Sequence, residues 1–244
     1  MKQNIYDNEI FFREYTSLRD SGVTFNDFIE QPAIKSTISP LVGKSVLELE
    51  CGTGHFAKYC IDHGAARVVA VDISTKMIDR AMKENPHERI NYICSPIEDL
   101  EFQEQSFDIV VSSLAIHYIE DYSGLIKMVS RLLKTGGEFV FSTEHPIVTA
   151  KKEKNAWVED AEGNILHWPL DNYHEEGKRE IHWYVEGVVV YHRTIATLLN
   201  TLIEHGLALE KLIEPQSTPE GLQQMPRLVN EKRRPSFIII KSRK

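Results

Sequence analysis

Between residues 46 and 72 the chain places a short apolar run, a glycine turn, a helix-like segment and a second apolar run that ends on an acid. The first run stops at Cys51-Gly52-Thr53-Gly54, and the second ends at Asp72. Glycine lets the backbone approach a ligand closely, and an acid at the tip of the second strand can accept both hydroxyls of a ribose. This order predicts half of an α/β fold that binds a nucleotide-like ligand.

The glycine turn alone leaves two classes of cofactor open. Gly52 and Gly54, followed by Ala57, also fit the fingerprint of dinucleotide-binding proteins. Glu48 lies in the preceding strand, four residues before Gly52. A carboxylate at this position repels a pyrophosphate but suits a ligand that carries an ammonium and a sulfonium.

Length and composition predict one soluble domain. The chain has 244 residues, 42% of them hydrophobic, and a formal net charge of −8. The acidic balance disfavours nucleic acid as a partner, and the apolar stretches are too short to cross a membrane. Three cysteines without metal-ligand spacing and an N-terminus without a signal-peptide core predict a cytoplasmic protein. We expect a monomer or a homodimer.

Strand and helix patterns alternate along most of the chain. Strands are expected at 45–49, 67–71, 90–94, 107–111, 138–142, 207–213 and 236–241, and helices at 54–63, 75–84, 121–134 and 194–205. Ser74 is the expected N-cap of the helix at 75–84, and residues 134–137 are expected to form a turn. This alternation requires a mostly parallel sheet with helices on both faces.

Two segments fall outside the alternation. Residues 11–38 predict two helices broken at Gly22 and closed by Pro32, and residues 150–192 are polar and aromatic. We expect a single domain made of a helical lid (1–39), a cofactor-binding core (40–149), an inserted cover over the strand ends (150–192) and the C-terminal part of the core (193–244). Residues 231–234 are expected to form a solvated turn.

Five segments, in the right order, resemble the class I S-adenosylmethionine-dependent methyltransferases. They are the acid and glycine motif at 48–54, the strand end at 71–77, the turn at 96–100, the strand at 106–113 and the Gly136-Gly137 turn. Blocks around Glu144, Tyr191 and Arg234 look like a small-molecule branch of the family, the methyltransferase type 11-like proteins. The resemblance implies a Rossmann-like, seven-stranded, mostly parallel sheet, with S-adenosylmethionine as cofactor and S-adenosylhomocysteine as product.

Two positions depart from the family's pattern. Glu50 replaces the first glycine of the motif, and Pro96 replaces the acid that contacts the adenine amino group. The backbone of Ile97 or the side chain of Glu98 is therefore expected to serve the adenine. The resemblance assigns the cofactor to Arg19, Glu48, Glu50, Cys51, Gly52, Gly54, Asp72, Ile73, Met77, Pro96, Ile97, Glu98 and Ser113.

Among these residues, Asp72 is expected on the ribose, Glu48 near the ammonium and Met77 under the adenine. Arg19 is expected to neutralise the ligand carboxylate from the lid, because a carboxylate needs a cation or backbone donors.

Residues that follow strands four and five, or lie in the cover, are candidates for the acceptor site. His117 and His145 come after strand ends that face the ligand crevice, where a histidine can remove a proton as the methyl group arrives. For each histidine a structural role is equally open. The candidate acceptor-binding residues are Tyr15, Tyr118, Tyr173, Trp183, Tyr191, His192 and Arg193, although a folded cover also needs aromatic residues for its own core. We expect no metal site.

The expected function is methyl transfer from S-adenosylmethionine to a nitrogen or oxygen atom of a small molecule. One alternative is a catalytically degenerate cofactor-binding protein, because Glu50 and Pro96 depart from the motifs. Another is an NAD(P)-dependent oxidoreductase, which is disfavoured because none of the tyrosines has a lysine four residues on. The motif that many amino-directed nucleic-acid enzymes carry after strand four is replaced by Ser112-Ser113-Leu114.

Overall fold

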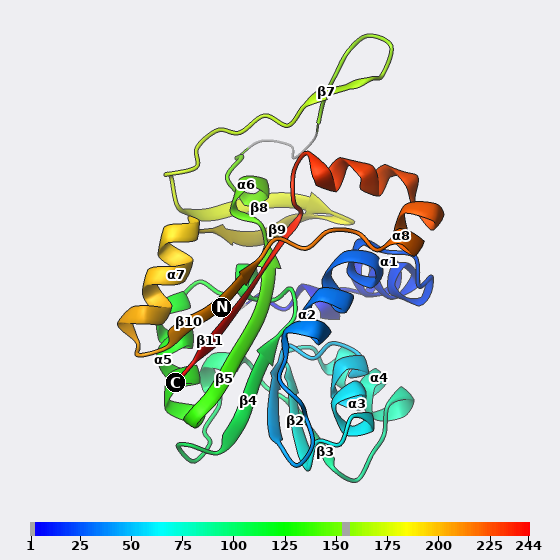
Figure 1. Cartoon of the computed structure of the whole chain (residues 1–244). Helices are drawn as coiled ribbons and strands as arrows, with labels where there is room; N and C mark the ends of the chain where they lie inside the picture. Colours follow the sequence, from blue (N-terminus) through cyan, green and yellow to red (C-terminus); the bar gives the residue numbers. More distant parts are fainter. Residues whose placement is uncertain (1–2, 153–156) are drawn as a thin grey trace.

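A seven-stranded sheet forms the centre of the computed structural model, which describes residues 3–152 and 157–244. The strand order is β10-β11-β5-β4-β1-β2-β3 (Figure 1). The strands are β1 (Ser45–Leu49), β2 (Arg67–Asp72), β3 (Ile90–Cys94), β4 (Phe107–Ser112), β5 (Leu133–Glu144), β10 (Ala208–Ile213) and β11 (Phe237–Arg243). β11 runs antiparallel to both β5 and β10, whereas β1 to β5 are parallel. The expected Rossmann-like fold class is confirmed.

Helices cover both faces of this sheet (Figure 1). On one face, α5 (Tyr122–Leu132) and α7 (Ile195–Glu204) pack through Val129 and Leu202 onto inward-facing residues such as Phe141. On the other face lie α2 (Gln31–Thr37), α3 (His55–Asp62) and α4 (Thr75–Glu84). Because side chains alternate along a strand, β1 gives Leu47 to the first core and Val46 to the second.

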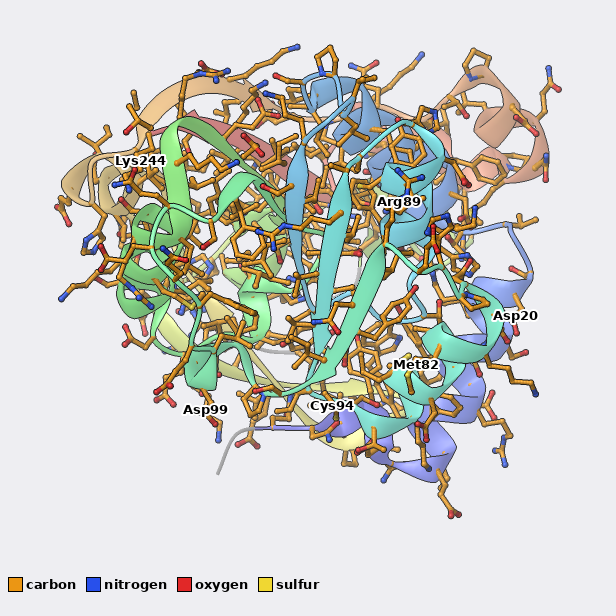
Figure 2. The ribbon with its side chains drawn as sticks, turned by 90° about the horizontal axis from the view of Figure 1, so that it is seen from below. Asp20, Met82, Arg89, Cys94, Asp99 and Lys244 are labelled. Atoms are coloured by element: carbon orange, nitrogen blue, oxygen red, sulfur yellow. The ribbon has the colours of Figure 1, made fainter. Side chains whose placement is uncertain are left out.

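The lid consists of η1 (Ile5–Asp7), α1 (Glu9–Asp20), the π-helical turn η2 (Asn26–Glu30) and α2. The predicted break at Gly22 is confirmed, with a φ of 65° at this residue. The predicted end at Pro32 is wrong: Pro32 lies in the first turn of α2, where a missing N–H costs nothing, and the helix continues to Thr37. At the end of α1, Asp20 ion-pairs with Arg80 of α4 at 2.6 Å (Figure 2 labels Asp20).

The cover over the strand ends contains two hairpins. β8 (Gly177–Trp183) pairs with β9 (Val185–His192), and β6 (Val158–Glu159) pairs with β7 (Ile165–His167). Figure 1 shows the β8–β9 hairpin lying across the carboxyl end of β5. The short helix α6 (Pro146–Thr149) connects β5 to this cover, and α8 (Pro219–Gln224) with η5 (Pro226–Lys232) packs beside the lid. The sequence patterns did not predict α6, α8 or η5.

Two predicted turns have a different structure. β5 begins at Leu133, directly after α5, so residues 134–137 lie within the strand rather than in a separate turn. In the second predicted turn, at 231–234, Glu231 and Arg234 are buried. The Glu231 carboxylate accepts hydrogen bonds from Ser236 N and Oγ, both at 2.8 Å. The expected solvated turn at 231–234 is therefore wrong for these two residues.

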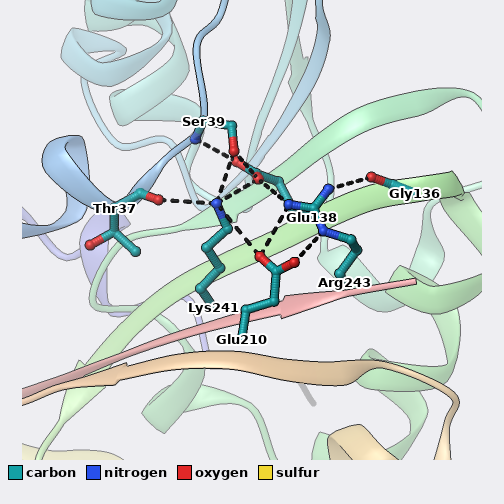
Figure 3. A network of polar contacts seen from close by, with 7 residues as sticks. All are labelled: Thr37, Ser39, Gly136, Glu138, Glu210, Lys241 and Arg243. Atoms are coloured by element: carbon teal, nitrogen blue, oxygen red, sulfur yellow. Dashed lines mark hydrogen bonds and ion pairs between the residues drawn. The ribbon is translucent and has the colours of Figure 1, made fainter.

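A network of charged groups closes the end of the sheet away from the strand tips (Figure 3). Glu138 of β5 lies 2.7 Å from Lys241 Nζ of β11 and accepts hydrogen bonds from Ser39 N at 2.8 Å and Oγ at 2.6 Å. Glu210 of β10 binds Arg243 in the same network. These contacts tie the segment after α2 to the sheet, six positions along β5 from Glu144 at its other end.

Candidate active site

A cavity of about 260 Å³ lies at the carboxyl ends of the parallel strands, between the lid and the β8–β9 hairpin. Twelve of the predicted site residues line it: Tyr15, Arg19, Glu48, Glu50, Cys51, Gly52, Asp72, Met77, Ser113, His117, Tyr118 and Trp183. Lid, core and cover thus all contribute to one site. Parallel α/β sheets bind ligands at this edge, where the strand ends leave a crevice.

The glycine turn after β1 has a left-handed backbone at three positions. The φ angles are 58° at Glu50, 54° at Gly52 and 77° at Gly54. A Cβ on Gly52 would meet no atom within 4 Å, so its backbone faces open space in the cavity. Gly54 is different: a Cβ there would lie 2.4 Å from the Tyr92 hydroxyl of β3, so this glycine is required for packing and does not line the cavity.

Asp72 holds the tip of β2 against the glycine turn. Its two carboxylate oxygens accept hydrogen bonds from Gly52 N and from Ser74 N, each at 2.8 Å. Burial raises the pKa of Asp72 to about 6, against these two hydrogen bonds. Because each carboxylate oxygen has two lone pairs, both oxygens keep capacity for a further donor such as a ribose hydroxyl.

Glu48 is a buried carboxylate, and its Oε2 finds no hydrogen-bond partner among residues 3–152 and 157–244. Burial and the charge of Asp72 raise its pKa well above the usual range. A buried polar atom without a partner is costly unless a ligand satisfies it. Glu48 lines the cavity, so its unpartnered carboxylate fits a ligand that is cationic or donates a hydrogen bond.

Glu50, like Glu48, favours a positively charged ligand. Its side chain lines the cavity, and burial and Asp72 raise its pKa well above the usual range. Arg19 of the lid is the one lysine or arginine among the described residues of this lining, and it donates to Thr24 Oγ1 at 3.2 Å. Four carboxyl groups, those of Glu48, Glu50, Asp72 and Glu144, and one guanidinium line the cavity, and this set suits a ligand with more positive than negative charges.

Met77, predicted to lie under the adenine, lines the cavity, but besides Gly54 four other predicted cofactor-binding residues lie outside its lining. Ile73 follows β2, and Pro96, Ile97 and Glu98 lie in the turn after β3, between Cys94 and Asp99 (Figure 2). Ile97 is 1% exposed and packs in the core below α5. Glu98 lies close enough to Glu50 to raise its pKa. The contact of these four residues with the cofactor stays a prediction.

Aromatic side chains from three parts of the chain meet in the lining of the cavity. Tyr6 of the lid lies edge-on to Tyr15 and Tyr118, with ring centroids 5.0 and 6.3 Å apart. Trp183 at the end of β8 lies 5.8 Å from Tyr15. Burial raises the pKa values of Tyr6, Tyr15 and Tyr118, so these phenols are neutral.

His117 and His145 have different surroundings. His117 lines the cavity, its Nδ1 lies 3.3 Å from Thr143 Oγ1, and burial lowers its pKa to about 3. The His145 Nδ1 instead accepts from Ile147 N at 3.2 Å and caps α6, while Nε2 lies 3.0 Å from Glu214 Oε1. His145 is outside the cavity, so its position gives it a structural role.

Four predicted acceptor-binding residues attach the cover to the core instead of lining the cavity. His192 is 0% exposed, with Thr149 Oγ1 at 2.8 Å from Nδ1 and Tyr173 O at 2.9 Å from Nε2. The Tyr173 hydroxyl accepts from Ile195 N at 3.1 Å. Arg193 donates to the carbonyls of Ile119 and Glu120, and Tyr191 lies under its guanidinium at 5.7 Å.

Sequence reasoning missed other residues that line the cavity, among them Tyr6, Asn26, Gln31, Thr53, His55, Phe56, Glu144 and Phe237. Glu144 is the last residue of β5, and burial raises its pKa to about 7. The strand-end argument that selected His145 would have selected Glu144 if β5 had been extended by two residues. No sequence signal marks Tyr6.

A buried contact holds the lid onto the strand tips. Glu30 of η2 is 0% exposed and accepts from Ser142 Oγ at 2.6 Å, Ser113 Oγ at 2.9 Å and Gln31 Nε2 at 2.9 Å. Ser113 and Gln31 also line the cavity. The lid is thus fixed to the ends of β4 and β5 by a carboxylate that the sequence analysis did not select.

Comparisons with known proteins agree with this geometry. A family model described as a methyltransferase domain matches residues 47–141. An S-adenosylmethionine-dependent methyltransferase from Mesorhizobium loti is 40% identical, with a TM-score of 0.82 over 88% of this chain and 97% of that one. A putative enzyme of the same kind from Listeria monocytogenes is 37% identical, with a TM-score of 0.83 over 88% and 96%.

The similarity extends over the whole chain in another relative. An uncharacterized protein from Haemophilus influenzae is 36% identical over 253 residues, which cover 100% of this chain and 98% of that protein. The chain belongs to the class I S-adenosylmethionine-dependent methyltransferases. It is an enzyme with S-adenosylmethionine as its cofactor, and the alternative of an NAD(P)-dependent oxidoreductase is set aside.

Proposed function

We propose that this enzyme methylates a nitrogen or oxygen atom of a small molecule bound among the aromatic side chains of the cavity. The observation that carries the proposal is the meeting of Tyr6 and Tyr15 of the lid, Tyr118 of the core and Trp183 of the cover in one cavity lining. A volume of about 260 Å³ suits the reacting ends of a cofactor and a small acceptor rather than a folded polymer. Within the described residues, no helix is long and apolar enough to cross a membrane.

The residues around the glycine turn fit the cofactor. We assign its ribose hydroxyls to Asp72, its ammonium to Glu48 and its carboxylate to Arg19, with Met77 beside the adenine. Bound S-adenosylmethionine supplies a methyl group on a positively charged sulfur atom. The protein's part is to orient the acceptor and to exclude water, which are the main contributions a protein makes to such a transfer.

His117 is retained in this proposal as a neutral group at the acceptor end. With a pKa of about 3 its ring is uncharged at neutral pH, and it is too weak a base to hold a proton there. We therefore propose that His117 orients the acceptor through a hydrogen bond. His145 has no part in the proposal, because both ring nitrogens are engaged outside the cavity.

The test follows a labelled methyl group. The protein is incubated with S-adenosylmethionine that is tritium-labelled on the methyl group and with a bacterial extract separated into small molecules, protein and RNA. Label in the small-molecule fraction, lost with Asp72→Ala, supports the proposal. Transfer to protein or RNA instead would contradict it. Calorimetric binding of S-adenosylmethionine by both proteins serves as the control for loading.

A further inference from the structure

A second cavity, of about 730 Å³, adjoins the first beneath the β8–β9 hairpin. Tyr118, Glu144 and Trp183 line both cavities, so these side chains stand where the two meet. We call this second cavity the outer cavity. An acceptor that moves from the outer cavity toward the glycine turn passes these three side chains. The site therefore places one carboxylate and two aromatic rings at the position of the acceptor.

The Glu144 carboxylate forms no hydrogen bond or ion pair with any other described residue. Against the effect of burial, which raises the pKa of Glu144, the charge of Arg234 lowers it. The Arg234 guanidinium lies on the ring of Trp168 at 4.3 Å, and its Nη2 donates to Ser236 Oγ at 3.2 Å. Glu144 sits at the carboxyl end of β5, with His117 and Tyr118 beside it, and both of these are neutral. A carboxylate in this setting attracts a cation.

Basic residues of the outer cavity do not compensate Glu144. The Arg179 guanidinium donates hydrogen bonds to the carbonyls of Ala150, Lys178 and Glu175. Lys152 forms an ion pair with Glu175. Lys151 lines this cavity together with two acids, Glu180 and Glu186. The charge that faces an acceptor where the two cavities meet is therefore negative.

Aromatic rings line the same cavities as Glu144. Tyr118 and Trp183 line the cavity with Tyr6 and Tyr15, and the faces of such rings attract cations. We propose that the acceptor is an amine that binds as a protonated cation between these rings and Glu144, and that Glu144 takes its proton. This inference rests on the proposed function and narrows its nitrogen-or-oxygen acceptor to nitrogen.

The transfer then balances. The ammonium gives one proton to the Glu144 carboxylate and becomes a neutral amine with a free lone pair. The nitrogen forms a bond to the methyl carbon as the carbon–sulfur bond breaks, and the electron pair of that bond stays on sulfur. The products are a neutral thioether and a methylated ammonium, and Glu144 later releases its proton to water.

The experiment compares two probes of the same shape on the protein saturated with S-adenosylhomocysteine. Benzylamine carries a positive charge at neutral pH, and benzyl alcohol does not. Titration calorimetry is done with the unchanged protein, with Glu144→Gln and with the control Glu204→Gln, which removes the same charge from an exposed position at the end of α7. Thermal unfolding and affinity for S-adenosylhomocysteine confirm that each variant folds and is loaded.

We expect benzylamine to bind at least about ten-fold more tightly than benzyl alcohol, and Glu144→Gln to remove this preference while Glu204→Gln keeps it. Equal binding of the two probes, no binding of benzylamine, or a preference that survives Glu144→Gln would overturn the inference. These outcomes leave the proposed function intact, because that proposal fails on a different result, label in protein or RNA.

Discussion

Glu48 and Glu138 are two buried carboxylates of the same sheet, exposed to 3% and 2%, with opposite surroundings. Glu138 lies 2.7 Å from Lys241 and accepts two hydrogen bonds from Ser39 (Figure 3). Glu48 is next to another acid, Asp72, and one of its oxygens has no partner among the described residues. A buried carboxylate whose partners are all within the protein contributes to the stability of the fold. A buried carboxylate that lacks a partner contributes to ligand binding instead, because the ligand supplies the missing partner.

The largest effect is expected at the paired carboxylate. Glu138→Gln leaves Lys241 buried without its anion, so the free energy of unfolding should fall by about 3 to 5 kcal/mol. Chemical denaturation measures it. The control is Glu210→Gln in the same network, where Arg243 is 39% exposed, and its cost should stay below about 1 kcal/mol. Equal losses in the two variants would remove the distinction between Glu138 and its neighbours.

At the unpaired carboxylate the effect should fall on binding. Glu48→Gln should weaken S-adenosylmethionine binding by about 1.5 to 3 kcal/mol, the size of a lost charged hydrogen bond. Its free energy of unfolding without ligand should be unchanged or higher, because a buried charge next to Asp72 has been removed. Calorimetric titration and denaturation of the same sample test both halves. A variant that loses stability but keeps its affinity would reverse our interpretation of Glu48.

Asp72→Ala tests the ribose assignment. Cofactor binding should weaken by roughly 1 to 3 kcal/mol, measured by calorimetry. Asp79→Ala, which removes an exposed acid from α4, is the matched control and should bind normally. Unchanged affinity in Asp72→Ala would refute the assignment.

Asp72 and Asp108 allow the same comparison through the pH dependence of stability. The folded-state pKa of Asp72 is raised from 3.8 to about 6, so its contribution to stability is complete below 3.8 and is lost as the pH rises through 6. Asp108 hydrogen-bonds Ser45 and pairs with Lys134 at 2.8 Å, which lowers its pKa to about 2. Its contribution is present above 3.8 and is lost as the pH falls through 2.

Unfolding midpoints from about pH 2 to about pH 8 separate the two aspartates. The stability of the unchanged protein relative to Asp72→Asn should decrease between pH 4 and 7, and relative to Asp108→Asn it should decrease only below pH 4. Parallel curves would show that neither carboxylate titrates as its surroundings indicate.

The smallest effect is expected at Glu50, which has a φ of 58° where the family has a glycine. Glu50→Gly should stabilise the unliganded protein by no more than about 1 kcal/mol, because relief of the left-handed backbone is partly offset by the added freedom of the unfolded chain. Cofactor affinity should be retained or increased. A large loss of affinity would show that the Glu50 side chain itself binds the cofactor.

Local signals were enough to predict the half of the sheet that carries the cofactor. β1, β3 and α4 have the predicted bounds, and Ser74 caps α4 by accepting from Met77 N. The reason is that each strand there is an apolar run bounded by turn residues, and the glycine turn fixes the backbone beside it. Twelve predicted residues, most of them from these motifs, line the cavity.

The acceptor end could not be predicted in the same way. Tyr6 reaches the cavity because the lid folds back over the strand tips, and no spacing in the sequence encodes that approach. Trp183 was selected as an acceptor-site candidate and lines the cavity, but its residue type did not distinguish it from Tyr173, which does not. His192 and Tyr173 have the expected residue types, but they contact each other and the core residues Thr149 and Ile195. Pro32 and Glu231 were misjudged because their roles depend on their neighbours in the folded chain: α2 continues beyond Pro32, and the Ser236 backbone donates to Glu231.

The attachment of the cover has a consequence for how enzymes of this kind diverge. Arg193, directly after β9, donates to the carbonyls of Ile119 and Glu120 between β4 and α5. Every residue type offers a carbonyl, so substitutions on the core side leave these bonds in place. The residues that face the acceptor can then be substituted during evolution while the hairpin stays attached. New acceptors can thus be selected without first rebuilding the scaffold.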